Sequence, residues 1–584
     1  MPRLRLSHPD RRAAEPGSVR PGLRDGWLEG LLDRRSIGVA AAVVTGLALV
    51  LAFPAADLGP LAFVALVPLL LAAERRRPTA AGALGVLAGL VFFALHVTWI
   101  AQIGSDRAAG ILALAALTVV QALFLGAFFA LVPASARLGW ARLPLLAATW
   151  AAIELVRAQV PLGGFAWGLL GLSQHDGGPL LPLARVVGVY GLSAVIAAVN
   201  LVLAGAVLAA QARRARPALA LAGLAVLLPL TGLAAPAPPP VDGPSKRLAV
   251  VQGSVPFDRS NRGRTNQAVF QRHVAMTEAL AGAPTPPDLV VWGEGAADDD
   301  PTTTPSRAEG VAAAAAAARA PVLLGSTTVQ GGVAGKRRYA TEGLLFTAEG
   351  RLADRYVKRR LVPFGEYIPA AGLLRRLVPA TNQLPYDKVP GTELRPMLLD
   401  GTRFGVLICY ETAYPQDTRS LARDGAQFVV VLANNASFGR SPLARQHLAT
   451  SQLRAVEEGR TVVHAALSGI SGVIGPDGRV TGATGLYQST ILLAEVGPRR
   501  GLTPYAHIGR LVEAVLVGLA VALLAAVAAD RLRRRSGETV ATSGTNEPAA
   551  SAVAATGSGL TPGAADPASS ASAPDRPAPG PAPT

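Results

Sequence analysis

The stretch FGVLICYE, residues 404–411, decides the fold, because it places the only cysteine of the chain directly after a strand-like run. Residues 404–408 are apolar and partly β-branched, which predicts a short buried strand. Cys409 would therefore stand at the carboxyl end of a strand, the edge at which open α/β sheets keep their active sites. A lone cysteine is more often a small buried hydrophobe, so its meaning depends on its neighbours.

Two further short runs end in a polar residue of the kind that a thiol needs. Residues 288–292 are followed by Glu294, and residues 355–358 end in Lys358 and continue into LVPFGEY, residues 361–367. A thiol with a pKa of about 8.5 is mostly protonated at neutral pH, so attack requires help. A carboxylate can take the thiol proton, and an ammonium can stabilise the thiolate and an oxyanion. The alternative for each residue alone is an ordinary solvated charge.

Taken together, these motifs resemble the nitrilase superfamily, in which a Glu-Lys-Cys triad performs acyl chemistry. The long form YVKRRLVPFGEYIP (356–369) with CYE (409–411), in a chain rich in apolar runs, is similar in particular to the apolipoprotein N-acyltransferase family. The resemblance extends over residues 37–529. It implies that Glu294, Lys358 and Cys409 are the catalytic residues, and that neither a cofactor nor a metal takes part.

The same resemblance implies supporting residues around the triad. Glu366 and Glu411 match further acidic positions, and Glu366 would orient Lys358 or the active-site loop. Ordinary structural salt bridges are the alternative for both. Tyr410 is expected to form a wall or oxyanion contact. Candidate substrate-binding residues are Trp292, Phe364, Arg375, Arg376, Trp99 and Trp167.

Two other features have alternative interpretations. Residues 368–389 contain leucines beside Arg375 and Arg376, which favours an amphipathic arm at the lipid surface over a packed surface helix. Glu154 and Arg157 are three residues apart and share a helix face. An intramembrane pair of this kind is often functional, but a structural pair between helices is equally compatible with the sequence.

The sequence also departs from the family pattern. The usual Trp-Pro-Glu appears with Gly293 in place of proline. A segment usually like Asn-Asp-Ala-Trp-Phe-Gly reads NNASFG at residues 434–439, and a usual Arg-Ala-x-Asn-x-Gly reads HAALSG at residues 464–469. The triad is intact, so the acyl-transfer interpretation stands.

The composition is that of a membrane protein. Of 584 residues, 50% are hydrophobic and 16% are charged, and the mean hydropathy is +0.36. The net charge of +16 comes mostly from arginines that flank apolar runs, which indicates the positive-inside pattern and not nucleic-acid binding. A single cysteine excludes an intramolecular disulfide. The basic first 35 residues lack the apolar core of a cleavable signal peptide.

Eight apolar runs predict about eight membrane spans. The basic clusters between the runs alternate so that both termini lie in the cytoplasm and the segment after Pro236 lies outside it. The predicted spans cover residues 37–53, 61–73, 80–103, 108–132, 143–160, 186–210, 218–233 and 511–529.

Between the seventh and eighth runs the texture changes to short strands alternating with helices, which predicts an α/β domain. The expected strands are residues 248–252, 288–292, 321–326, 343–352, 404–408, 428–434 and 472–480, with hairpin turns at 349–350 and 477–478. The expected helices are residues 267–280, 306–319 and 444–458. By resemblance, the domain is a nitrilase-like α-β-β-α sandwich.

The predicted organisation has five parts: a basic cytoplasmic leader (1–35), a membrane domain of about seven helices (36–235), a nitrilase-like catalytic domain (246–497), a transmembrane helix (508–530) and a disordered cytoplasmic tail (536–584). The resemblance implies a multi-pass protein of the inner cell membrane with an extracytoplasmic catalytic domain. It also implies a membrane phospholipid as acyl donor and a diacylglyceryl apolipoprotein as acceptor. The rival hypotheses are a membrane-anchored amidase and a catalytically weakened lipid-binding homologue.

Overall fold

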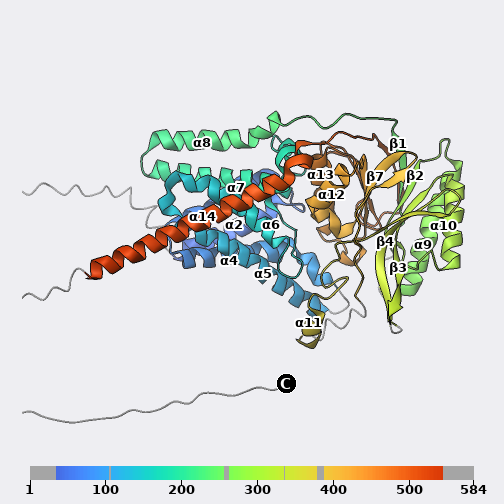
Figure 1. Ribbon diagram of the computed structural model, residues 1–584, viewed down its shortest axis with the longest axis horizontal. Helices are drawn as coiled ribbons and strands as arrows, with labels where there is room; N and C mark the ends of the chain where they lie inside the picture. Colours follow the sequence, from blue (N-terminus) through green and yellow to red (C-terminus); the bar gives the residue numbers. More distant parts are fainter. Residues whose placement is uncertain (1–34, 104–106, 256–261, 334–335, 378–386, 544–584) are drawn as a thin grey trace, which may run out of the picture. The chain divides into compact units, whose positions relative to one another are not determined.

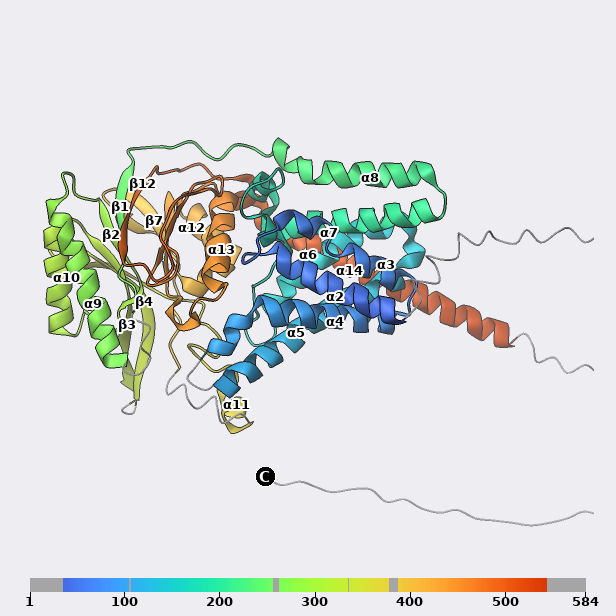
Figure 2. The same cartoon turned by 180° about the vertical axis from the view of Figure 1, so that it is seen from behind.

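The computed structural model describes residues 35–103, 107–255, 262–333, 336–377 and 387–543. The predicted leader, apart from residue 35, and residues 544–584 of the predicted tail lie outside the described residues. The chain divides into two compact units, Met1–Ala528 and Ala529–Thr584. The first unit contains a bundle of apolar helices and a domain with two β-sheets (Figures 1 and 2).

Six helical segments in the described residues are long and apolar enough to cross a membrane: Arg35–Ala52, Pro78–His96, Arg107–Ala134, Leu181–Gln211, Ala215–Ala234 and Pro504–Arg534. The remaining two predicted spans form shorter helices. The helices of the bundle are α2 (Arg35–Ala52), α3 (Val67–Glu74), α4 (Pro78–His96), α5 (Arg107–Ala134), α6 (Arg142–Arg157), α7 (Ala184–Gln211), α8 (Ala215–Leu230) and α14 (Pro504–Ser543).

Helix α14 extends further than the sequence predicts, into the segment expected to be a disordered tail. It continues to Ser543, beyond the predicted tail boundary at residue 536. Once a long helix has formed, each added residue gains a hydrogen bond without a new nucleation cost. The sequence contains no proline between Pro504, at the start of the helix, and Pro548.

Contacts between helix ends group the basic residues at one end of the bundle. Gly38, at the start of α2, lies against the guanidinium of Arg76 just after α3. Arg142, at the start of α6, pairs with Glu74 at the end of α3, with Nη2 2.5 Å from Oε1. The starts of α2 and α6 and the end of α3 therefore lie together at one end of the bundle.

The opposite end of the bundle contacts the two-sheet domain. Trp99, just after α4, donates from Nε1 to Oε1 of Gln446 at 3.1 Å. His175, between α6 and α7, lies with Nδ1 2.8 Å from Oε1 of Gln452. Both glutamines belong to α13 (Leu443–Glu458), so this helix forms the main contact between the two parts.

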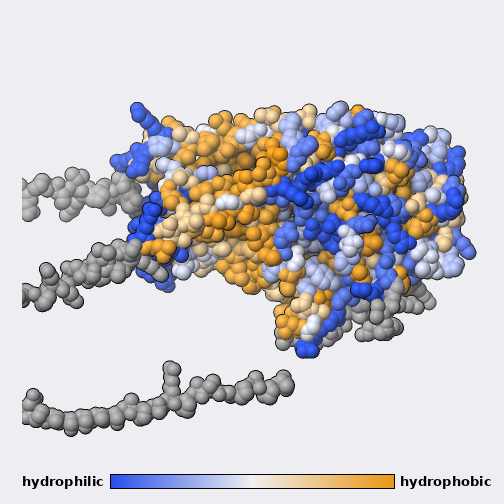
Figure 3. All heavy atoms as spheres, in the orientation of Figure 1, coloured by the Kyte–Doolittle hydropathy of each residue, from blue (hydrophilic) through white to orange (hydrophobic). Residues whose placement is uncertain are grey.

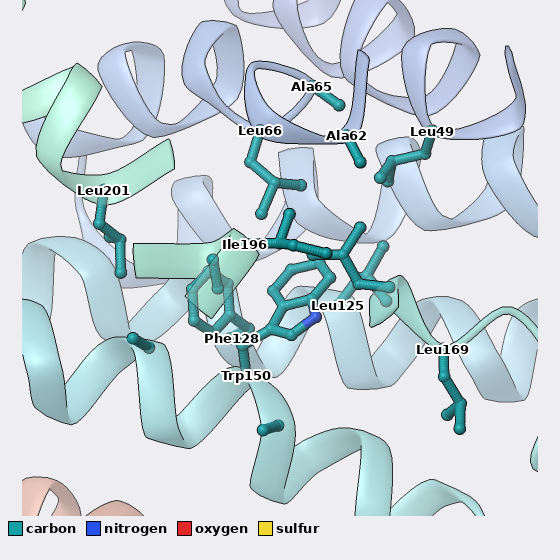
Figure 4. Packing of buried hydrophobic residues seen from close by; sticks show 14 of the residues in the cluster. Leu49, Ala62, Ala65, Leu66, Leu125, Phe128, Trp150, Leu169, Ile196 and Leu201 are labelled. Carbon is teal, nitrogen blue, oxygen red and sulfur yellow. The ribbon is translucent and has the colours of Figure 1, made fainter. Parts of the chain in front are cut away.

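Aromatic and aliphatic side chains fill the bundle core. Phe128 of α5 and Trp150 of α6 meet edge to face with ring centroids 4.9 Å apart, beside Leu125 and Ile196 (Figure 4). On the face shown in Figure 3, the surface of the bundle is also mostly hydrophobic, whereas the surface of the two-sheet domain is mostly hydrophilic. A helix that is apolar both inside and outside is typical of a membrane-embedded segment.

The second domain contains two six-stranded sheets. One has the strand order β12-β1-β2-β3-β4-β5 and the other β11-β10-β9-β8-β7-β6. The strands of the first sheet are β1 (Lys246–Gln252), β2 (Leu289–Ala297), β3 (Val322–Val333), β4 (Lys336–Phe346), β5 (Leu352–Val357) and β12 (Thr490–Val496). Those of the second are β6 (Met397–Leu399), β7 (Thr402–Ile408), β8 (Phe428–Ala433), β9 (Val462–Ala466), β10 (Gly472–Ile474) and β11 (Val480–Ala483).

The two sheets face each other across a core, and helices cover their outer faces. Val250 of β1 and Val430 of β8 belong to the cluster between the sheets. Helices α9 (Arg262–Glu278) and α10 (Pro305–Ala318) lie against the first sheet, and α12 (Pro415–Arg423) and α13 against the second. This α-β-β-α layering confirms the predicted nitrilase-like sandwich.

Each predicted run contains a strand, but the run 472–480 is a hairpin, because β10 and β11 pair antiparallel on either side of the predicted turn at 477–478. The run 343–352 is two strands, because the chain turns at the predicted hairpin 349–350, where Gly350 has a φ of 77°. Strands β3 and β4 extend well beyond the predicted run, because polar residues such as Thr327 and Thr341 pair across this antiparallel hairpin. Strands β6, β9 and β12 and helix α12 were not predicted.

Helices α4 and α5 pack closely through glycine, which gives a prediction for the stability of the bundle. A Cβ at Gly89 would lie 2.6 Å from the Cα of Ala122, whereas one at Gly223 on α8 would meet nothing within 4 Å. We expect Gly89→Val to destabilise the detergent-solubilised protein by about 1–3 kcal/mol, since overpacking forces the backbones apart. Thermal unfolding should show a lower midpoint for Gly89→Val and an unchanged one for the control Gly223→Val. Equal midpoints would contradict this packing.

Candidate active site

A β-bulge presents Glu294 to the site. Strand β2 pairs regularly with β3 up to Trp292, and its register then shifts before Ala297. Gly295, with a φ of 76°, adopts a left-handed conformation inside the irregular segment. Bulges of this kind re-aim a side chain next to active sites. Glu294 thereby reaches Lys358, with Nζ 3.1 Å from Oε1.

Lys358 is a buried ammonium held between two carboxylates. It follows β5, and its side chain is only 1% exposed. Its Nζ lies 3.1 Å from Oε1 of Glu294 and 3.0 Å from Oε2 of Glu366. Burial alone would lower the pKa of Lys358, but the two carboxylates outweigh burial and hold this pKa well above its ordinary value. Lys358 is therefore a permanent cation in the site.

Glu366 is fixed by a network of its own. Its Oε2 accepts the backbone N–H of Val362 at 2.9 Å, and its Oε1 accepts hydrogen bonds from Thr341 at 3.0 Å and from Nζ of Lys388 at 3.1 Å. Burial would raise the pKa of Glu366, and the ammonium groups of Lys358 and Lys388 lower it to about 2. Glu366 is thus an anion that orients Lys358 and closes the loop 362–366.

Cys409 directly follows β7 and opens a 3-10 turn, Cys409–Ala413. Its φ is 51°, a left-handed conformation that costs a residue other than glycine about 1–3 kcal/mol. The carbonyl oxygen of Cys409 accepts hydrogen bonds from Oγ1 of Thr412 and Nε2 of His447, each at 3.0 Å. The backbone of Asn434 acts to lower the pKa of the thiol. These contacts hold the strained turn.

The neighbours of Cys409 act on its thiol in opposite directions. Burial raises the pKa of the thiol well above its ordinary value, the carboxylate of Glu294 raises it further, and the ammonium of Lys358 lowers it. The resting sulfur is therefore protonated at neutral pH. Nucleophilic attack then requires transfer of that proton to a nearby base, and Glu294 is the carboxylate whose charge acts most strongly on the thiol.

Glu411 ties the cysteine turn to the lysine segment without forming an ion pair. Its Oε1 accepts the backbone N–H groups of Arg359 at 2.7 Å and Arg360 at 3.1 Å and the hydroxyl of Tyr356 at 2.8 Å. Its Oε2 accepts the backbone N–H of Ile408 at 2.8 Å. The alternative of an ordinary salt bridge does not describe Glu411, since its partners are mainly backbone groups. It fixes the spacing between Cys409 and Lys358.

Tyr410, Trp167 and Trp99 form one aromatic cluster where the bundle meets the cysteine turn. The ring of Trp167 stacks on Tyr410 with centroids 6.4 Å apart and meets Trp99 at 5.6 Å. Phe165 and Phe438 belong to the same cluster. The structure thus places Trp99 and Trp167 together beside the nucleophile, although they come from separate loops of the bundle.

Other predicted residues do not join the triad. Trp292 is fully buried, donates to Oγ1 of Thr277 at 3.0 Å and packs against Phe270 in the core under α9. Strand alternation points it to the face of the sheet away from the second sheet, so it serves the core and does not line the site. Phe364 lies 42% exposed on the loop 362–367, at the protein surface.

Arg375 and Arg376 lie on α11 (Ala371–Leu377), a short helix beside the segment 378–386, which lies outside the described residues. Arg375 pairs with Asp387, with Nη2 3.1 Å from Oδ1. Leu373 on the same helix is 58% exposed. The helix carries both exposed apolar and basic side chains, as the amphipathic arm requires.

Glu154 and Arg157 are both buried, but each binds mainly to other groups. Arg157 donates to the carbonyl oxygens of Trp167 and Gly168, both at 2.7 Å. Glu154 accepts from Nε1 of Trp150 at 2.9 Å and from the backbone of Leu170 at 2.8 Å. Both residues therefore shape the loop that presents Trp167.

Two of the sequence departures are neighbours in space. A Cβ at Gly293 would lie 2.6 Å from the backbone nitrogen of Leu467 and 2.9 Å from the carbonyl carbon of Ala466. A proline at position 293 would therefore clash with the backbone of the segment 464–469. The glycine fits this course of the chain.

Sequence reasoning missed four residues of the site: Thr341, Lys388, Gln446 and His447. Thr341 and Lys388 contact Glu366, and their placement depends on the long β3–β4 hairpin and on an isolated pairing of Tyr339 with Lys388. Gln446 and His447 face inward from a helix that was predicted. The signal available in the sequence was that these two adjacent polar residues lie on a predicted helix of the α/β domain.

Comparisons with known proteins agree with this arrangement. The family model for the apolipoprotein N-acyltransferase N-terminal domain matches residues 45–202, and that for carbon-nitrogen hydrolase matches residues 247–504. Proteins named apolipoprotein N-acyltransferase from Geobacter metallireducens and Azotobacter vinelandii are each 33% identical, over 85% and 86% of this chain and 95% of each relative. The relative from Mycolicibacterium smegmatis is 33% identical over 90% of this chain and 93% of its own length.

Among solved structures, an amidase from Nesterenkonia sp. is 20% identical, with a TM-score of 0.31, over 44% of this chain and 94% of that one. The family match over residues 247–504 assigns the two-sheet domain to the carbon-nitrogen hydrolase class. The identity over nearly the whole length of its relatives is more specific: this chain belongs to the apolipoprotein N-acyltransferase family.

The opposite effects of Glu294 and Lys358 on the Cys409 thiol lead to a test of the site electrostatics. We expect Glu294→Gln to lower the apparent pKa for alkylation of Cys409, because it removes a negative charge that disfavours the thiolate. Lys358→Met should raise it. The rate of iodoacetamide alkylation is measured against pH by mass spectrometry, and the signal is specific because the chain has one cysteine.

The control for this experiment is Glu393→Gln, a carboxylate with a side chain 81% exposed, which should leave the alkylation profile unchanged. Shifts of the same sign in Glu294→Gln and Lys358→Met would contradict the assigned electrostatics.

Proposed function

We propose that this protein is a membrane N-acyltransferase. It transfers an acyl chain from a membrane phospholipid, through a thioester on Cys409, to the α-amino group of the diacylglyceryl-cysteine at the start of an apolipoprotein. The observation that carries the proposal is the contact of the cysteine turn with the Trp99–Trp167 cluster at the end of an apolar bundle. The names of the relatives support the same activity.

In the first half-reaction, Glu294 takes the proton from the sulfur of Cys409, and the thiolate attacks an ester carbonyl carbon of the phospholipid. The ammonium of Lys358 stabilises the oxyanion of the tetrahedral intermediate. When the C–O bond to the glycerol breaks, the leaving alkoxide receives the proton from Glu294. A lysophospholipid departs, and the acyl chain remains on Cys409 as a thioester.

In the second half-reaction, the neutral α-amine of the lipoprotein attacks the thioester carbonyl carbon. Glu294 removes a proton from the attacking nitrogen, and Lys358 again stabilises the oxyanion. The C–S bond breaks, the amide forms, and the thiolate recovers the proton from Glu294. In both half-reactions, Glu366 and Glu411 hold the catalytic groups at a fixed spacing.

Lipid substrates would enter from the side of the membrane, past Phe364 and α11. Support comes from the exposed side chains of Phe364 and Leu373, 42% and 58%, beside the basic residues Arg375 and Arg376. Apolar side chains flanked by arginines suit the boundary between acyl chains and headgroups. Trp99 and Trp167 would then contact the acyl chain next to the sulfur.

We further propose that the protein is a multi-pass component of the inner cell membrane with about eight spans. The catalytic domain, about residues 246–497, would be extracytoplasmic, and both termini would be cytoplasmic. Support comes from the basic residues Arg76 and Arg142, which gather at the end of the bundle away from α13.

The amidase rival makes a different demand on the site. A hydrolase needs water at the acyl-enzyme, whereas the cysteine turn lies against Trp99, Trp167, Phe165 and Phe438, which disfavour water. The weakened-homologue rival requires a damaged triad, but Glu294 and Lys358 are paired and oriented. The acyltransferase is therefore the stronger hypothesis.

The proposed topology is tested with single cysteines in a Cys409→Ala background. We expect Glu349→Cys to react in intact cells, with the outer wall permeabilised where needed, with a membrane-impermeant maleimide. Arg214→Cys should react only after the inner membrane is opened. Glu349 lies in the exposed β4–β5 turn of the catalytic domain, with a side chain 67% exposed, and Arg214 is exposed between α7 and α8. The reverse pattern would place the catalytic domain in the cytoplasm.

The thioester is tested with purified protein and phospholipid alone. We expect Cys409 to gain one acyl chain that neutral hydroxylamine removes, and a diacylglyceryl peptide with a free α-amine to discharge it as N-acyl peptide. Because attack needs the free lone pair of an amine, a peptide whose α-amine is blocked as an amide should leave the thioester in place. Cys409→Ala and Glu294→Gln should not charge, for lack of the nucleophile and of the base. Steady release of free fatty acid without acceptor would instead favour the amidase rival.

A further inference from the structure

Helix α13 directs two consecutive residues into two different parts of the site. Gln446 accepts hydrogen bonds from Nε1 of Trp99 at 3.1 Å and of Trp167 at 2.9 Å, and donates to the carbonyl of His96 at 3.0 Å. His447, the next residue, lies with Nε2 3.0 Å from the carbonyl oxygen of Cys409. Both residues are at most 5% exposed. One helical step therefore joins the aromatic cluster to the nucleophile.

The partners of His447 fix its protonation state. Nε2 of His447 lies 3.0 Å from both the carbonyl oxygen of Cys409 and Oγ1 of Thr412. The carbonyl oxygen only accepts, and the hydroxyl of Thr412 donates to the same carbonyl, so Nε2 carries a proton. On the other side of the ring, Nδ1 lies 3.3 Å from Nδ2 of Asn435, an amide group that donates. Nδ1 is therefore unprotonated, and the ring is neutral. Burial, which lowers the pKa of His447 to about 4, agrees with this.

The remaining surroundings of His447 also favour the neutral ring. The imidazole of His464 on β9 meets it edge to face at 4.7 Å, and Trp167 lies 6.0 Å away. The ammonium of Lys358 disfavours a second positive charge. His447 therefore does not take up the thiol proton, which leaves that task to Glu294.

We propose that His447 and Gln446 are positioning residues for the nucleophile. His447, in the tautomer selected by Asn435, holds the carbonyl of Cys409 so that the left-handed turn persists, and Gln446 links this contact to Trp99 and Trp167. Seating of the acyl chain against the tryptophans then fixes the orientation of the sulfur. This proposal rests on the proposed acyl transfer and extends it to a coupling between the lipid-binding cluster and the thiol.

The first test removes the donor from His447. We expect His447→Leu to slow thioester formation from phospholipid by about tenfold to a hundredfold, since a misplaced nucleophile loses the reactive geometry. The phospholipid concentration for half-saturation should change little, because His447 does not touch the tryptophan side chains through hydrogen bonds. His447→Gln retains an N–H donor at the end of the side chain and should restore much of the rate.

A matched control separates positioning from stability. Ser451 is also buried on α13, one turn after His447, and its hydroxyl bonds Nδ1 of His464 at 2.8 Å. Ser451→Ala should lower the thermal midpoint and leave the rate of thioester formation unchanged. Identical behaviour of His447→Leu and Ser451→Ala, with stability lost and kinetics intact, would overturn the proposal.

The second test changes the charge of the His447 ring and leaves the residue in place. In Asn435→Asp, a carboxylate replaces the amide beside Nδ1 and favours an imidazolium. We expect a shift of the alkylation profile of Cys409 to lower pH, because a new positive charge next to the turn stabilises the thiolate. An unchanged alkylation profile would show that Asn435 does not control His447.

The alkylation readout does not depend on acyl transfer, so it distinguishes the two proposals. If the wild-type protein fails to charge with phospholipid while Asn435→Asp shifts the alkylation profile, the acyl-transfer function is wrong and the positioning of Cys409 stands. If the wild-type protein charges, His447→Leu matches it in rate and Asn435→Asp matches it in pH profile, the positioning proposal is wrong. Asn435→Asp keeps a polar side chain of the same size, so its alkylation profile tests the proposal even where His447→Leu does not fold.

Discussion

The buried ammonium of Lys358 is the constraint on which the arrangement of the site depends. Removing a charge from water costs several kcal/mol unless partners are held in place. Lys358 is 1% exposed, so Glu294 on β2 and Glu366 on the loop after β5 must both reach it. Glu366 in turn requires the backbone of Val362 and the hydroxyl of Thr341 on β4. One buried cation thus brings three segments of the first sheet to a common point.

Glu411 performs the matching task for the second sheet. Its carboxylate binds the backbone of Ile408 beneath the nucleophile and that of Arg359 beside Lys358. The cysteine from one sheet and the lysine from the other are therefore spaced by a single side chain. The thiol remains protonated at rest, because burial and Glu294 outweigh Lys358. Such a site keeps the sulfur inactive until Glu294 accepts its proton.

The sequence predicted the parts of the site that follow from strand ends. Glu294, Lys358 and Cys409 each stand at or just after the end of a predicted strand, and the resemblance to the nitrilase superfamily grouped them as a triad. Thr341 and Lys388 were missed because the register of the β3–β4 hairpin is set by long-range pairing. Trp292 was assigned to the site by resemblance, but the bulge in β2 separates its direction from that of Glu294. For the described bundle, hydropathy located each helix. Hydropathy did not show that α3 and α6 are shorter than the six segments long enough to cross a membrane.

The helical bundle does more than anchor the catalytic domain. Arg157 holds the carbonyls of the loop that carries Trp167, and Trp167 in turn reaches Tyr410 and Gln446. A simple anchor would need no polar contacts of this kind, because every buried donor costs free energy unless an acceptor is placed to receive its hydrogen bond. The contacts place the Trp99–Trp167 cluster against the turn that begins at Cys409. The same surface disfavours water near the sulfur, and a thioester survives longest where water is scarce. Under the proposed acyl transfer, an apolar cluster against the cysteine turn would favour transfer to an amine over hydrolysis.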